Sequence, residues 1–231
     1  MEDLEIYKQM AAQRCLDYVE SGMALGLGTG ATAGWMLREL AARLADGRLR
    51  QIVGVPTSER TALLARELGI TLVTLEQQPR LDLALDGADE VDPQLRLIKG
   101  LGGALLREKI VAASADRFLV MGSAIKRVAR LGERSPLPVE VVAFGIPLCA
   151  RRLAALGCEP VLRRDSTGAP FITDEGHVIL DCRFGVIDDP EALAAAIHAI
   201  PGVVEHGLFI GMASLAVLAG AGGVSIVCAS V

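Results

Sequence analysis

The alternation of short apolar runs with amphipathic segments is the feature that most constrains this chain. The runs at 23–28, 51–56, 81–87 and 117–122 are too short for buried helices and are flanked by glycine, proline or serine. Strands of this kind, separated by helices, are typical of parallel sheets that are buried on both faces. The pattern predicts an α/β fold with an open, mostly parallel sheet and helices on both faces.

The segments between these runs carry apolar residues at helical spacing. A further β-branched run at 70–75 is predicted to be a strand, and the helix before it has Ser58 as a candidate N-cap and Gly69 as a candidate C-terminal stop. Helices are predicted at 4–18, 32–45, 58–69 and 103–113. Because only 3% of the residues are aromatic, the core must consist mainly of Ala, Val, Leu and Ile.

After Pro136 the order changes to strand, helix, strand, strand, helix, strand, as in a ferredoxin-like split unit. The six segments are 139–144, 147–157, 159–164, 177–184, 190–200 and 203–209. We therefore predict a smaller ferredoxin-like α+β lobe at 133–206. The larger α/β domain would consist of 1–132 with 207–231, the tail returning to the first sheet.

Charge and composition narrow the possible partners to small molecules. The net charge is −5, the pI is near 5.3 and lysines and arginines form no block, so we expect no nucleic-acid partner. The uncharged tail 207–231 is long enough to span a bilayer, but its five glycines and three serines favour a buried strand, turn and strand. The N-terminus lacks the charged-then-apolar order of a signal peptide, so a cytoplasmic location is expected and a membrane partner is not.

Cysteines and histidines give no sign of a metal site or a disulfide framework. No CxxC pair occurs, and the three histidines show no metal-ligand spacing, so we predict no metal. The five cysteines are expected to be reduced and to pack as small hydrophobic residues; they are Cys15, Cys149, Cys158, Cys182 and Cys228.

A glycine loop, GLGTGATA, follows the first predicted strand and opens a predicted helix. Small residues allow backbone N–H groups to approach an anion there, and Thr29 and Thr32 can add hydroxyl donors. The loop is neither a GxGxxG motif, because Ala31 takes the place of the third glycine, nor a P-loop, because no Gly-Lys-Ser/Thr follows. A plain strand-to-helix turn without a ligand remains the alternative.

The stretch DGADEVDPQLRLIKGLGGALLREK concentrates ionisable side chains among glycines. Asp86 and Asp89 follow a strand end, and two carboxyls held close together cannot both ionise freely. Lys99 lies beside glycines with exposed backbone donors, and Glu108 lies on the following helix. A carboxylate base, a neutral acid and donors for an oxyanion are what proton abstraction next to a carbonyl requires. The alternative is that the aspartates cap helices and Glu108 is solvated.

These motifs, together with VPTS, PLPVEV and IPGVVEHGLF, occur in the order found in one enzyme family. Over nearly its full length the chain resembles ribose-5-phosphate isomerase of the A type. The resemblance implies an aldose–ketose isomerase without metal or cofactor, which interconverts D-ribose 5-phosphate and D-ribulose 5-phosphate through an enediol in the non-oxidative pentose phosphate pathway. It also implies a homodimer or homotetramer whose larger domain is catalytic.

The resemblance carries residue roles onto matching positions. Glu108 would be the base that moves the proton between C2 and C1, and Asp86 would assist ring opening and hydroxyl-proton movement. Asp89 and Lys99 would hold the sugar oxygens and stabilise the enediolate, while Lys8 would lie near the phosphate. The remaining substrate contacts implied are Thr29, Gly30, Ala31, Thr32, Gly87, Ala88, Gly100, Leu101, Gly102 and Lys126.

Three departures from the family pattern keep other interpretations open. Ala31 stands where a serine is common, Leu101 where a glycine is common, and the tail is unusually free of charge. A non-catalytic sugar-phosphate-binding protein of the same fold is therefore one alternative. Amino-sugar-phosphate deaminases and sugar-lactone hydrolases share the broad architecture, but they would be expected to use a histidine, and none lies near residues 86–108 in the sequence.

Overall fold

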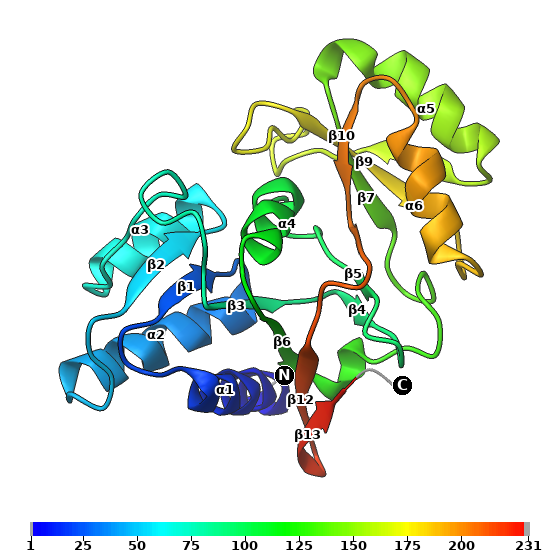
Figure 1. The fold of residues 1–231 in the computed structure, drawn as a ribbon. Helices are drawn as coiled ribbons and strands as arrows, with labels where there is room; N and C mark the ends of the chain where they lie inside the picture. The colour runs from blue at the N-terminus through cyan, green and yellow to red at the C-terminus, as the bar shows by residue number, and fades with distance from the viewer. Residues whose placement is uncertain (1, 229–231) are drawn as a thin grey trace.

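The computed structural model describes residues 2–228 and consists of a larger α/β part and a smaller α+β lobe (Figure 1). The larger part is built on a six-stranded sheet with the order β13-β12-β6-β3-β1-β2. All neighbouring strands are parallel except β12 and β13, which are antiparallel. The strands are β1 (Ala24–Leu27), β2 (Val53–Pro56), β3 (Leu83–Gly87), β6 (Phe118–Ser123), β12 (Leu215–Gly220) and β13 (Gly223–Val227).

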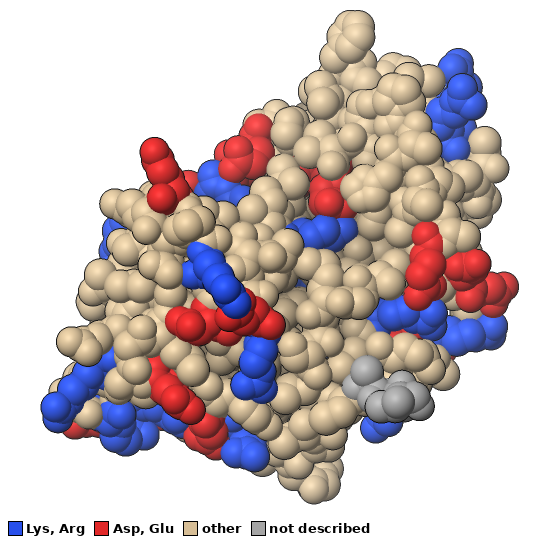
Figure 2. All heavy atoms as spheres, in the orientation of Figure 1, with Lys and Arg blue, Asp and Glu red and all other residues tan. Residues whose placement is uncertain are grey.

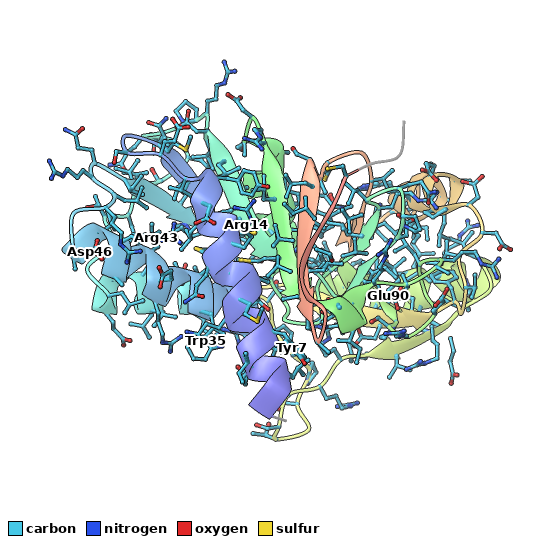
Figure 3. All side chains as sticks on the ribbon, turned by 90° about the horizontal axis from the view of Figure 1, so that it is seen from below. Tyr7, Arg14, Trp35, Arg43, Asp46 and Glu90 are labelled. Carbon is cyan, nitrogen blue, oxygen red and sulfur yellow. The ribbon has the colours of Figure 1, made fainter. Side chains whose placement is uncertain are left out.

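Helices cover both faces of this sheet, which confirms the predicted fold class. On one face, α1 (Glu2–Cys15) packs against α2 (Ala31–Ala45) and crosses β6 and β12, as seen from below in Figure 3. A core of leucines, alanines and methionines fills this layer. On the other face, α4 (Leu105–Ala113) lies against β3, while α3 (Glu59–Glu67) lies beside β2 at the sheet edge.

Ser58 caps α3 as predicted, because its hydroxyl accepts the Thr61 N–H, and Gly69 takes the positive φ of 72° that ends the helical turn.

The smaller lobe has the predicted ferredoxin-like arrangement. Its antiparallel sheet has the order β10-β7-β9-β8, with both helices packed on the buried core of the sheet. The elements are β7 (Leu137–Val141), α5 (Ile146–Ala155), β8 (Glu159–Leu162), β9 (Val178–Arg183), α6 (Pro190–His198) and β10 (Val203–His206). The domain boundaries at 132/133 and 206/207 remain a prediction.

A third sheet, which the sequence did not predict, lies between these two parts. It joins β4 (Glu90–Val91), β5 (Leu97–Ile98) and β11 (Leu208–Phe209), each only two residues long. Short 3₁₀ turns complete the structure at Leu16–Tyr18, Ala124–Lys126 and Ala143–Gly145. Strands of two residues carry no readable periodicity, and so sequence patterns could not identify them.

Two local expectations were wrong. The run 70–75 forms no strand, because only Leu72 makes a β-bridge, to Gly54, before the chain turns at Thr74 and Gln77. The tail returns to the first sheet as expected and β12 is buried, but β13 is an edge strand whose side chains are mostly exposed. No helix within residues 2–228 is both long and apolar enough to cross a membrane.

Acidic and basic side chains are interspersed on the face of the molecule that Figure 2 shows. This face presents no extended basic surface of the kind that nucleic acid requires.

Glu90 of β4 fixes the segment that leads into the smaller lobe. Its side chain is 1% exposed, and its carboxylate accepts N–H groups from Gly132 (2.6 Å), Arg134 (2.8 Å) and Ser135 (2.6 Å). Hydrogen bonds from backbone N–H groups to a buried carboxylate are stronger than bonds between neutral groups. One side chain therefore fixes three backbone N–H groups of the segment that connects the two parts.

Replacing Glu90 with alanine should destabilise the protein by about 2–4 kcal/mol, because three backbone donors lose their acceptor. Urea unfolding monitored by circular dichroism measures this change. Glu76→Ala, which removes an exposed acid outside this segment, is the control and should change the free energy of unfolding by less than about 0.5 kcal/mol. Equal effects of the two substitutions would contradict the role given to Glu90.

Candidate active site

The candidate site lies where the strand order of the six-stranded sheet reverses. From β1 the chain continues to β2 on one side, whereas β3 pairs with the other side of β1. Loops leaving the carboxyl ends of β1 and β3 therefore diverge and leave a crevice between them, the usual ligand position in open α/β sheets. The glycine loop follows β1 and the acidic stretch follows β3, so the topology brings the two motifs together.

Two glycines make this meeting possible. A Cβ atom on Gly28 would lie 2.2 Å from Oδ1 of Asp86, so any side chain there would displace the acid. Gly30 has a φ of 111°, which only glycine adopts readily, and it turns the chain into α2 at Ala31. Ala31 and Thr32, the first two residues of this 15-residue helix, line the crevice, so the positive end of the helix dipole lies at a possible anion site.

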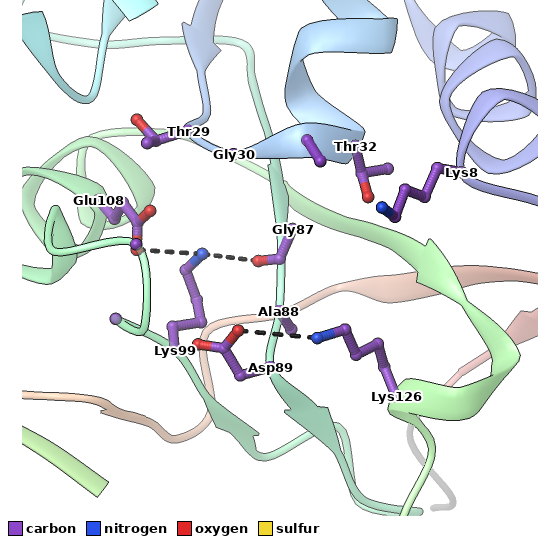
Figure 4. A pocket seen from close by; sticks show the side chains of 13 residues that line it. Lys8, Thr29, Gly30, Thr32, Gly87, Ala88, Asp89, Lys99, Glu108 and Lys126 are labelled. Atoms are coloured by element: carbon purple, nitrogen blue, oxygen red, sulfur yellow. Dashed lines mark hydrogen bonds and ion pairs between the residues drawn. The ribbon is translucent and has the colours of Figure 1, made fainter. Parts of the chain in front are cut away.

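A pocket of about 190 Å³ occupies the crevice, and Figure 4 shows the side chains around it. Thirteen residues line it, and each of them was a predicted site residue: Lys8, Thr29, Gly30, Ala31, Thr32, Gly87, Ala88, Asp89, Lys99, Gly100, Gly102, Glu108 and Lys126. The two other predicted residues lie outside the lining. Asp86 is buried next to Lys99, and Leu101 is 42% exposed and contributes its backbone N–H to Oδ2 of Asp89 (3.0 Å).

The floor of the pocket is a buried cluster of one cation between two acids. The ammonium of Lys99 donates to the carbonyl oxygen of Gly87 (2.6 Å) and lies 3.0 Å from Oδ2 of Asp86 and 3.2 Å from Oε2 of Glu108. Each of the three side chains is at most 5% exposed. Neither of these two carboxyl oxygens has a well-aligned hydrogen bond within the described residues, and both are closed off from solvent, so the Lys99 ammonium is the cation that stabilises their charge.

Burial and mutual repulsion shift the pKa values of this cluster. Burial, reinforced by the charge of Asp86, raises the pKa of Glu108 to about 8. Burial also raises the pKa of Asp86, against the opposing charge of Lys99. For Lys99, burial lowers the pKa, but Asp86 and Glu108 outweigh burial and raise it overall. The two acids therefore share a proton near neutral pH while the lysine stays charged.

The two acids differ in how their charge is stabilised. Oδ1 of Asp86 accepts the N–H groups of Thr29 (3.0 Å) and Gly87 (2.7 Å), whereas among residues 2–228 the carboxyl of Glu108 is partnered only by the Lys99 ammonium. Donors to a carboxylate favour its ionised form. The backbone donors therefore favour the ionised form of Asp86 over that of Glu108.

The hydroxyl of Thr29 is surrounded by other hydroxyl groups. It lies within hydrogen-bond distance of the hydroxyls of Thr57 (2.8 Å), Ser58 (2.8 Å) and Thr61 (2.9 Å), a buried cluster that joins the glycine loop to the start of α3. Thr29 thus braces the loop, and Thr32 is the threonine whose side chain faces Lys8 in Figure 4. The VPTS motif contained the signal for this cluster, but only the fold brings its hydroxyls to Thr29.

Two lysines from distant elements complete one end of the pocket. Lys8 comes from α1, where it pairs with Glu5 (2.6 Å), and Lys126 comes from the 3₁₀ turn after β6, with its ammonium 3.8 Å from Asp89. With the amino end of α2, they form a positively charged end suited to a phosphate.

A cluster of possible metal ligands forms elsewhere, which the sequence spacing did not suggest. One ligand atom each of His198, Glu205 and His206 lies within 4.8 Å of the others. However, Nδ1 of His206 accepts the Leu208 N–H (3.2 Å), so the neutral ring carries its proton on Nε2. Burial lowers the pKa of His206 to about 3. The ammonium of Lys109 donates to the Glu205 carboxylate at 2.6 Å. The donor set therefore fits an ammonium better than a metal ion.

Comparison with known proteins identifies the family. The model of the family described as Ribose 5-phosphate isomerase A (phosphoriboisomerase A) matches residues 53–223. The chain belongs to this family. The Roseiflexus castenholzii protein named Ribose-5-phosphate isomerase A is 77% identical over 222 residues, covering 96% of this chain and 95% of that protein.

Solved structures of ribose-5-phosphate isomerases share the whole fold. One, described as a complex with phospho-erythronic acid, has a TM-score of 0.95 and 38% identity, covering 97% of this chain and 99% of that one. The ribose 5-phosphate isomerase A from Methanocaldococcus jannaschii has a TM-score of 0.92 and 40% identity, with coverages of 97% and 99%.

The raised pKa of Glu108 predicts a pH-dependent stability. Because the pKa rises from 4.5 to about 8 on folding, the stabilising contribution is complete below pH 4.5 and is lost as the pH rises through about 8. Glu108→Gln keeps the side chain neutral, so between about pH 5 and pH 9 it should lose less stability than the wild type, by up to a few kcal/mol.

Urea unfolding at both pH values measures this difference. Glu76→Gln, an exposed acid outside the pocket, is the control and should follow the wild type. A Glu108→Gln curve parallel to the wild type would mean that Glu108 ionises normally.

Proposed function

We propose that this chain is an aldose–ketose isomerase that interconverts D-ribose 5-phosphate and D-ribulose 5-phosphate by proton transfer through an enediolate. The observation that carries the proposal is the buried Glu108 carboxyl, with its raised pKa, held beside the Lys99 ammonium in a pocket with one cationic end. Family membership adds independent support.

Binding would place the phosphate at the amino end of α2, between Lys8 and Lys126, and the carbonyl end of the open sugar at Lys99 and Glu108. Gly30, Ala31 and Thr32 would contact the phosphate end, and Gly87, Ala88, Gly100 and Gly102 would line the sugar. Asp89, whose carboxylate is fixed by the Leu101 N–H, would accept a sugar hydroxyl. Glu108 acts as the base in its ionised form, which the Lys99 ammonium 3.2 Å away stabilises.

The reaction moves one carbon-bound proton and one hydroxyl proton. Glu108 removes the proton from C2, the electron pair forms the C1–C2 double bond, and O1 becomes an oxyanion stabilised by the Lys99 ammonium. The hydroxyl proton passes from O2 to O1 with help from Asp86, the C2 carbonyl forms, and Glu108 returns its proton to C1. Oxidation state is conserved over the whole molecule, so the proposed chemistry requires no redox cofactor.

We further propose that the protein acts in the cytoplasm as a homodimer or homotetramer on a diffusible sugar phosphate, in the non-oxidative pentose phosphate pathway. The cysteines within the described residues are unpaired, in keeping with a reducing compartment. The alternative of a non-catalytic binder loses its main support, because Leu101 lies outside the pocket and the four ionisable residues remain in place.

The purified chain should convert ribose 5-phosphate to ribulose 5-phosphate, and EDTA should leave the rate unchanged, because the charge that develops on O1 is neutralised by Lys99. A coupled spectrophotometric assay, with and without EDTA, measures this rate. Absence of turnover while ribose 5-phosphate still raises the melting temperature would instead identify a non-catalytic binder.

Glu108→Gln should lower kcat by about 10²–10⁴-fold, because the amide cannot accept the C2 proton. The affinity for phospho-erythronic acid, measured by calorimetry, should change little, since the amide retains the shape of the acid. Glu76→Gln is again the matched control and should retain full activity. A Glu108→Gln variant with wild-type kcat would exclude Glu108 as the base.

A further inference from the structure

Arg163, which follows β8 of the smaller lobe, reaches across to the loop at the floor of the pocket. Its Nη1 donates to the carbonyl oxygens of Gly100 (2.9 Å) and Leu101 (3.2 Å). No sequence motif drew attention to this residue. One guanidinium nitrogen thus holds two successive peptides of the loop that follows Lys99.

The guanidinium is itself held rigidly. Asp181, on the neighbouring strand β9, accepts Nε of Arg163 at 2.9 Å with one oxygen and Nη2 with the other. The Arg163 side chain is only 12% exposed, and the Phe171 ring lies 5.9 Å from its Cζ. The same ring closes on Gly103, where a Cβ atom would lie 2.4 Å from it. Such a forked ion pair fixes the plane as well as the position of the guanidinium.

The hydrogen bonds from Arg163 to the two carbonyl oxygens determine where the loop N–H groups point. In a trans peptide the carbonyl and the following N–H point in opposite directions, and no cis bond occurs in the described chain. With the Gly100 and Leu101 oxygens directed at Arg163, the N–H groups of Leu101 and Gly102 are directed away from it. The Leu101 N–H meets Asp89, and the Gly102 N–H, at the pocket wall, has no partner among residues 2–228.

We propose that Arg163, held by Asp181, is a positioning residue for the isomerase: it orients the 100–102 peptides so that one N–H fixes Asp89 and the next is presented to the substrate. Its positive charge behind these peptides also polarises them toward the pocket, where negative charge develops on the sugar. This role rests on the proposed function. It makes the smaller lobe part of the active-site machinery although none of that lobe's side chains lines the pocket.

Docking of the lobe itself does not depend on Arg163. Arg107 of α4 pairs with Glu175 of the lobe (2.5 Å), and Asp174 of the lobe accepts the Glu59 N–H at the start of α3 (2.9 Å). Removing the guanidinium should therefore disturb the loop peptides more than the attachment of the lobe.

The test compares Arg163→Ala with Arg164→Ala. The guanidinium of Arg164, the adjacent arginine, donates within its own hairpin, to the carbonyl oxygen of Gly168 (2.7 Å). Arg163→Ala should lower kcat by about 10–100-fold, the size of effect expected from a misplaced catalytic group, and should change KM by less than about threefold. Low-millimolar guanidinium should restore part of the lost kcat. Arg164→Ala should behave as wild type. Asp181→Asn should lower kcat in the same direction, because it weakens the fork without removing the guanidinium.

A kcat of Arg163→Ala within about twofold of wild type would overturn the proposal, since such an effect is below that of one misplaced group. A second outcome would also overturn it: a lower kcat, an equal loss of affinity for phospho-erythronic acid and no rescue by guanidinium. That combination would indicate a purely structural role.

A second measurement separates this proposal from the proposed function. In protein labelled with ¹⁵N-glycine, the Gly102 amide resonance should shift in Arg163→Ala and not in Arg164→Ala. If the wild type fails to isomerise ribose 5-phosphate, the proposed function is wrong. The Gly102 resonance would still show whether Arg163 determines the orientation of the Gly102 N–H. An unmoved Gly102 resonance would refute the positioning role.

Discussion

The placement of one buried ammonium between two buried carboxyls is the interaction on which the rest of the structure depends. Lys99 lies 3.0 Å from Asp86 and 3.2 Å from Glu108, and a single cation cannot neutralise both acids. Burying unbalanced charge is costly, so the surrounding fold must hold the cluster in place. The remaining imbalance appears as a raised pKa of Glu108, the property that a carboxyl needs to exchange protons with a carbon acid.

The architecture supports this cluster from three directions. The reversal of strand order between β1 and β3 opens the crevice, and Gly28 lets the backbone of the glycine loop lie against Asp86. From α4 comes Glu108, and the small sheet of β4, β5 and β11 carries Lys99 at the end of β5. Since the Lys99 N–H also donates to the Gly207 carbonyl, the returning tail is tied to the same site. The contacts that hold the fold together here are therefore also the ones that position Asp86, Lys99 and Glu108.

The smaller lobe acts through the backbone of the loop. Its side chains lie outside the pocket, but Arg163 and Asp181 hold the carbonyl side of the 100–102 peptides, and the ring of Phe171 closes on Gly103. Leu101, which departs from the usual glycine, is accommodated because its side chain points to solvent while its N–H points to Asp89. Because this loop acts through its backbone N–H groups, a larger side chain at position 101 is tolerated as long as the peptide planes keep their orientation.

The sequence by itself determined the alternation of strands and helices and the ferredoxin-like order of the second part, because burial periodicity is a local property. Its resemblance to one family predicted the residues that line the pocket. It could not determine which groups face each other. The threonine cluster around Thr29, the support of Asp89 by Leu101 and the contacts of Arg163 join residues up to 63 positions apart. The run at 70–75 has strand-like residues yet pairs only at Leu72, because the neighbouring chain, not propensity, decides whether an edge strand forms. The pKa values of Asp86, Lys99 and Glu108 likewise depend on the tertiary structure, because only folding buries these side chains and brings their charges together.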